Sequence, residues 1–152
     1  MSSLEELGFP DVFKSIANGT APSDLAATCL PTRSFLQMQG DLATHLPAAA
    51  DYVPLWGLNA FGVVAFDRRR RVFVRYYVGD ADDTVVAHDY EELCAFLFLE
   101  LMDAGVEESL DELARLFRFE HLDALRAFVV QHSAGPSHEL VPAFSRALRS
   151  PG

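Results

Sequence analysis

The chain has 152 residues, of which 50% are hydrophobic and 22% are charged, a composition typical of a globular domain with a substantial core. Its 22 acidic side chains outnumber the 12 basic ones, and the formal net charge is -10. Because binding to nucleic acids or anionic membranes depends on lysine and arginine, this balance argues against both functions. We therefore predict a single domain over residues 1–152 that binds no nucleic acid and no membrane and that attracts basic partners.

The N-terminal third predicts short helices. Apolar residues recur at helical spacing over 9–16, and Asn18-Gly19 is typical of a helix end. The apolar residues between Phe35 and Met38 fit either a short strand or the start of a helix. Residues 47–51 (PAAAD) are interpreted as a connection that leads into Tyr52–Trp56.

The middle of the chain predicts an antiparallel meander. Phe61–Phe66 and Val72–Val78 are rich in β-branched and aromatic residues and are separated by a polar turn, while Thr84–Ala87 forms a third short strand. In Val72–Val78 both alternating faces carry apolar side chains. We therefore expect both faces of the sheet to be at least partly covered.

The C-terminal half predicts helices. Asp89 and Glu92 form a capping box for a helix over Tyr90–Ala104, which is apolar nearly all round and is predicted to be the central buried helix. A second helix starts after Ser109, and a third spans Phe119–His132. Residues 133–142 are interpreted as a loop, and 143–148 as a short final helical turn.

These elements together predict an α+β fold. Its sheet is antiparallel or mixed with a meander core, and its helices pack mainly on one face of that sheet.

Four consecutive arginines, Arg68–Arg71, invite two interpretations. They could form a basic patch for phosphate or RNA, or they could be the solvated turn of a hairpin. The acidic net charge favours the hairpin. A third hypothesis is that the turn rests against acidic groups of the same chain. We also expect the acidic turn Gly79–Asp83 to lie at the opposite end of the meander.

A possible catalytic group is His88, which could act as a general base together with Glu91 or Glu92 at a strand-to-helix junction. The competing interpretation is that Asp89 caps the following helix and that both glutamates suit its positive end, and we favour it. The spacing of the five histidines fits no metal site, and glycine-rich phosphate loops and common catalytic motifs are absent. We therefore predict no catalytic residues, no cofactor and no metal.

The acidic residues cluster in two segments, residues 79–83 and 103–112. They could simply be solvated turns and helix starts, or they could form an anionic face for a basic protein partner. The candidate partner-binding residues are Asp80, Asp82, Asp83, Glu107, Glu108, Asp111 and Glu112.

The beginning of the chain and its apolar runs predict a cytoplasmic location. The sequence MSSLEELGF lacks the basic segment followed by an apolar one that marks a secretory signal. The longest apolar run, Leu93–Leu99, is far shorter than the roughly 20 residues of a membrane-spanning helix.

Four phrases within Tyr52–Gly105 resemble the SUKH superfamily in their order: VVAFD, VFVRYYV, ADD and DYEELCAFLFLEL. Members of that superfamily have an N-terminal helix, an antiparallel meander, an acidic turn and then the main helix. Val12–Gly19 is similar to the family's helix that ends in Asn-Gly. The superfamily includes bacterial immunity proteins that neutralise polymorphic toxins and fungal regulators of cell-wall glucan synthesis. It shares no catalytic residues, so none is carried over.

The resemblance implies a non-enzymatic protein that occludes a partner, often a basic toxin domain, through its acidic surface. Its fungal branch implies an alternative, a regulatory or scaffold module in cell-wall synthesis or signalling. A small enzyme that uses His88 with Glu91 or Glu92 is the third class of function.

Overall fold

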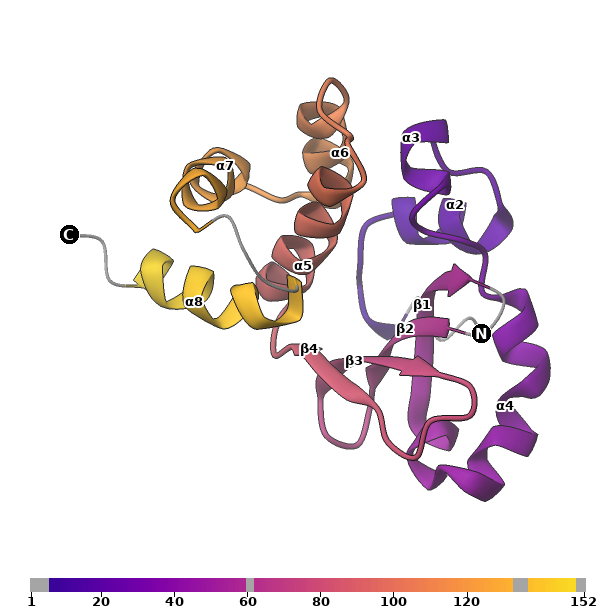
Figure 1. Ribbon diagram of the computed structural model, residues 1–152. Helices are drawn as coiled ribbons and strands as arrows, with labels where there is room; N and C mark the ends of the chain where they lie inside the picture. Colours follow the sequence, from indigo (N-terminus) through magenta and orange to yellow (C-terminus); the bar gives the residue numbers. More distant parts are fainter. Residues whose placement is uncertain (1–5, 60–61, 133–136, 150–152) are drawn as a thin grey trace. The chain divides into compact units, whose positions relative to one another are not determined.

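The computed structural model describes residues 6–59, 62–132 and 137–149 (Figure 1). The chain divides into two compact units, Met1–Val85 and Val86–Gly152, and each is described by itself. A four-stranded antiparallel sheet and several helices confirm the predicted α+β class. The prediction of one domain concerns the relation between the two units and stays a prediction.

The first unit contains the sheet, whose strands follow the order β1-β2-β3-β4, and the unit boundary falls within β4. Its elements are α2 (Val12–Asn18), α3 (Ser23–Ala26), α4 (Arg33–His45), the 3-10 helix η1 (Pro47–Asp51), β1 (Tyr52–Asn59), β2 (Gly62–Asp67), β3 (Val72–Tyr77) and β4 (Thr84–Ala87). The three predicted strands are therefore present within one residue of their expected ends, except that Phe61 lies outside the described residues.

Strand β1 and helix α4 also belong to this unit, and the sequence assigned neither segment a definite secondary structure. β1 pairs antiparallel with β2 and is irregular between Pro54 and Trp56, so neither a regular alternation nor an uninterrupted set of backbone donors marks it as a strand. The segment around Phe35, which fitted either a strand or a helix, is helical in α4 because its apolar residues, Phe35 and Leu42 among them, pack together against the sheet. The side-chain amide of Gln39 ties α4 to the next segment by donating to the carbonyl of Ala49, at 2.7 Å.

Both faces of the sheet are covered, as the apolar pattern of Val72–Val78 predicted. Val74 and Tyr76 of β3 join α4 and η1 in one hydrophobic cluster. On the neighbouring position, Phe73 stacks with Phe9, with ring centroids 5.9 Å apart, and contacts Phe66 of β2. The alternation of side chains along β3 therefore supplies two separate cores.

The second unit is helical. It contains α5 (Tyr90–Asp103), α6 (Leu110–Phe117), α7 (Leu122–Gln131) and α8 (Ser137–Arg149) (Figure 1). Most residues of α5 are buried, and both α7 and α8 contact it, which confirms α5 as the central helix of this unit. As predicted, the carboxylate of Asp89 caps α5 by accepting a hydrogen bond from the backbone N–H of Glu92 at 2.8 Å.

Helix α8 corrects the sequence analysis, which predicted a loop up to residue 142. The helix begins at Ser137 and continues through Pro142. A proline inside a helix removes one backbone hydrogen bond. The burial of Val141 and Phe144 on the inner side of α8 offsets that loss, and this gain depends on neighbouring helices that the local sequence does not reveal.

Candidate functional site

The arginine segment forms the four-residue turn between β2 and β3, and Asp67 organises it. The Asp67 side chain is only 1% exposed. It accepts hydrogen bonds from the backbone N–H groups of Arg69, at 2.9 Å, and Arg70, at 3.3 Å, and from the Arg70 Nε, at 2.6 Å. The turn is therefore held by a buried carboxylate at its first residue.

Asp83, the last residue of the acidic turn, meets the arginine turn, whereas Asp80 lies at the opposite end of β3, as expected, where its backbone N–H donates to the carbonyl of Tyr77 at 3.0 Å. The Asp83 carboxylate accepts hydrogen bonds from the Arg70 guanidinium and from the Tyr52 hydroxyl. The Asp83 side chain is 8% exposed, and a carboxylate so buried needs a cationic partner. Burial, followed by the hydrogen bond to Asp83, raises the pKa of Tyr52 well above its usual range.

These contacts confirm the hypothesis that the arginine turn rests against acidic groups of its own chain. Arg70 is bound by Asp67 and Asp83, and Arg68 pairs with Glu6 at 3.6 Å. The guanidinium of Arg71 lies over the ring of Phe66, 5.8 Å from its centroid.

The candidate partner-binding residues lie in both units: Asp80, Asp82 and Asp83 in the first, and Glu107, Glu108, Asp111 and Glu112 in the second. Three of them are engaged within the chain: Asp83 with Arg70, Asp111 with Arg126 at 3.2 Å, and Glu112 with Arg115. The other four are exposed and form no ion pair within the described residues: Asp80, Asp82, Glu107 and Glu108. The first two follow β3, and the last two lie between α5 and α6.

His88 contacts Glu92 rather than Glu91. Its backbone N–H donates to Glu92 Oε1 at 3.0 Å, and its ring Nδ1 lies 3.2 Å from the same oxygen. The His88 side chain is 69% exposed, so this pair lies at the surface of the second unit. The Glu92 carboxylate thus binds the residue that precedes the Asp89 N-cap, which agrees with a structural role for these residues at the start of α5.

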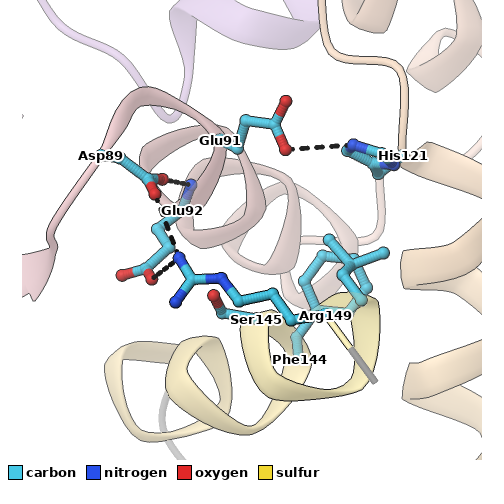
Figure 2. A pocket seen from close by; sticks show the side chains of 8 residues that line it. Asp89, Glu91, Glu92, His121, Phe144, Ser145 and Arg149 are labelled. Atoms are coloured by element: carbon cyan, nitrogen blue, oxygen red, sulfur yellow. Dashed lines mark hydrogen bonds and ion pairs between the residues drawn. The ribbon is translucent and has the colours of Figure 1, made fainter. Parts of the chain in front are cut away.

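A pocket of about 220 Å³ lies beside the N-terminus of α5, within the second unit (Figure 2). Glu91 Oε2 lies 3.0 Å from His121 Nε2, and Arg149 Nη2 lies 3.5 Å from Asp89 Oδ2 and 3.9 Å from Glu92 Oε2 (Figure 2). Its lining residues are Asp89, Glu91, Glu92, His121, Phe144, Ser145, Leu148 and Arg149.

Asp89, Glu91 and Glu92 stand out in the sequence as residues of a helix start, whereas the other lining residues of this pocket carry no signal in the sequence. His121, Ser145 and Arg149 are separated from α5 by between about twenty and sixty positions, and α8 was predicted to be mostly loop. No spacing signal connects them, because they meet only through the packing of α7 and α8 on α5.

The charge of Glu92 is stabilised where it is. Burial by itself would raise the pKa of its carboxyl, but hydrogen bonds from the backbone and ring of His88, and from Ser145, hold that pKa below its usual value. Glu92 is therefore a fixed negative charge in the pocket wall. Ser145, the only hydroxyl-bearing residue of the lining, is bound to this carboxylate.

Both cysteines are buried, Cys29 in the first unit and Cys94 in α5. Burial raises the pKa of Cys94 to about 12 and that of Cys29 well above its usual value. Thiols in such surroundings are poor nucleophiles because the thiolate is the reactive form.

Among the residues that the structure describes, no group of three or more histidine, cysteine or acidic side chains could hold a metal ion. In the same residues, no helix combines the length and the apolar character needed to cross a membrane. Comparison of the chain with family models, with curated proteins and with solved structures gives no match.

Proposed function

We propose that this chain is a protein-binding domain that occludes a basic partner through exposed acidic side chains. The observation that carries the proposal is the state of four carboxylates: Asp80, Asp82, Glu107 and Glu108. They are exposed and have no cationic partner within the described part of the chain, although the chain holds 12 basic residues. A net charge of -10 adds long-range attraction for a basic surface.

We further propose that the domain is of the SUKH type and acts in the cytoplasm as an immunity protein against a polymorphic toxin. The meander followed by a capped, apolar helix agrees with the order of elements in that superfamily. A basic toxin domain fits the charge of the chain. This proposal predicts a gene for a large secreted toxin beside the gene for this chain.

The immunity proposal is tested by co-expression. The toxin domain encoded beside this chain should arrest the growth of a bacterial host, and co-expression of the chain should restore growth. Growth arrest that persists although both proteins are present and folded would refute the proposal. A genome without a neighbouring toxin gene would favour the regulatory alternative.

The binding proposal is tested by neutralising each acidic pair with a charge-matched control in the same unit. In the first unit, the double variant Asp80→Asn/Asp82→Asn is compared with the control double variant Asp24→Asn/Asp41→Asn. In the second unit, the double variant Glu107→Gln/Glu108→Gln is compared with the control double variant Glu120→Gln/Glu139→Gln. An exposed charge pair contributes about 0.2–1 kcal/mol, so at least one site pair should weaken binding by about two- to thirty-fold.

The affinity of the wild type and of each variant for the basic partner is measured by calorimetry at several salt concentrations. The weakened variant should also show a smaller dependence of affinity on salt, whereas its control should resemble the wild type. Equal effects of the site and control variants would mean that only net charge matters, and they would refute a defined acidic binding surface.

A further inference from the structure

We infer that the pocket beside the N-terminus of α5 is an anchor site for one arginine or lysine side chain of a partner protein. We further infer that Arg149 partly fills this site in the free chain. The inference depends on the proposed function only for the source of that side chain, because the pocket belongs wholly to the second unit.

The size of the pocket suits a single side chain. Its volume of about 220 Å³ is below the roughly 300–1,000 Å³ of pockets that enclose cofactors or drug-sized ligands. Phe144 and Leu148 supply apolar lining that would contact an aliphatic stem. Figure 2 shows the Asp89 and Glu92 carboxylates next to the Arg149 guanidinium and the Glu91 carboxylate directed toward His121. Long basic side chains have this division into an apolar stem and a charged head.

The charges of the pocket select a cation. The lining holds three carboxylates and one guanidinium: Asp89 and Glu92 lie near Arg149, and Glu91 lies next to the imidazole of His121. The Glu91 side chain is 62% exposed, so its carboxylate remains accessible beside His121. The positive end of the α5 dipole is already matched by these carboxylates, which leaves little attraction for an anionic ligand.

Arg149 shows that a guanidinium can enter this site. Its Nη2 lies within 4.0 Å of both Asp89 and Glu92, but the distances of 3.5 and 3.9 Å are long for ion pairs. The Arg149 side chain is 71% exposed and stands at the end of α8, so little packing holds it in place. An exposed pair of this kind is readily exchanged for a better-placed cation.

The test uses n-propylguanidinium, which has a guanidinium head and a short apolar stem, and follows the amide NMR signals of residues 89–93. We expect saturable shifts in the wild type. Arg149→Ala should tighten binding by about two- to five-fold, because the internal competitor is gone, and Glu91→Gln should weaken it by a similar factor.

Two matched variants control for net charge. Arg115 is as exposed as Arg149 and pairs with Glu112 on α6, so Arg115→Ala removes the same charge outside the pocket. Glu107→Gln likewise removes one negative charge outside the pocket and is the control for Glu91→Gln. Both controls should leave the affinity of the probe unchanged.

Two results would overturn the inference. One is the absence of saturable shifts in both the wild type and Arg149→Ala. The other is binding of propionate at the same amides that is lost in Arg149→Ala, which would make the pocket an anion site. Neither result depends on a partner protein, so this inference can fail while the proposed acidic binding surface stands.

Discussion

The stability of the hairpin between β2 and β3 should depend on the carboxylate of Asp67. The substitution Asp67→Ala measures this contribution as a loss in the free energy of unfolding. The side chain is 1% exposed and accepts three hydrogen bonds, two from the backbone N–H groups of Arg69 and Arg70 and one from the Arg70 guanidinium. Alanine leaves all three donors without this acceptor.

The expected loss in the free energy of unfolding follows from these three hydrogen bonds. A hydrogen bond to a charged group contributes about 1.5–3 kcal/mol, but the turn is exposed and water can replace part of the loss. We therefore assign about 1 kcal/mol to each bond, which gives about 3 kcal/mol for Asp67→Ala. Asp67→Asn keeps an oxygen acceptor for the backbone and loses the charge that faces Arg70, so about 1 kcal/mol is expected.

Urea unfolding followed by the fluorescence of Trp56 is the assay, because this sole tryptophan is buried in β1 next to β2. Asp82→Ala is the control, since Asp82 is exposed, forms no ion pair within the described residues and should change stability by less than about 0.5 kcal/mol. An Asp67→Ala variant within about 1 kcal/mol of the wild type would refute the reasoning, as would an asparagine variant as unstable as the alanine variant.

Two further predictions concern Glu92 and Gly57. The pKa of Glu92 is lowered in the folded chain, so its contribution to stability is present above the unfolded value of about 4.3 and is lost as the pH falls through the folded pKa. Glu92→Gln should therefore destabilise the second unit at pH 7 and should approach the wild type under acid conditions. Gly57→Ala should cost about 1–3 kcal/mol, because the added Cβ would lie 3.0 Å from the Pro31 carbonyl oxygen and 3.3 Å from the Leu30 Cβ.

Each of these predictions has a built-in check. For Glu92, chemical unfolding is measured at several pH values, and a difference between wild type and variant that stays constant from pH 7 to pH 3 would contradict the assignment. For Gly57, the control is Gly40→Ala, which meets no atom within 4 Å and lies inside α4, so it should stabilise the chain by about 0.5–1 kcal/mol. Equal effects of the two alanines would contradict the steric argument.

The elements that the sequence predicted best are those whose signals are local. Helix α5 was foreseen with its cap, because Asp89 and Glu92 stand three residues apart and the apolar residues follow directly. Strands β2, β3 and β4 were foreseen because their residue types and the turns between them are contiguous. The covering of both sheet faces followed from the alternation along Val72–Val78, which needs no knowledge of distant segments.

The sequence by itself thus determined the α+β class, the meander, the capped central helix of the second unit and the excess of acidic side chains. Only the tertiary structure decided that Asp83 binds Arg70, that four of the candidate carboxylates are unpaired within the described residues, and that His121 and Arg149 join Glu91 in one pocket. The physical reason is that helix caps and strand alternation act over a few residues. Ion pairs and pockets form between segments that packing brings together, and their sequence separation carries no periodic signal.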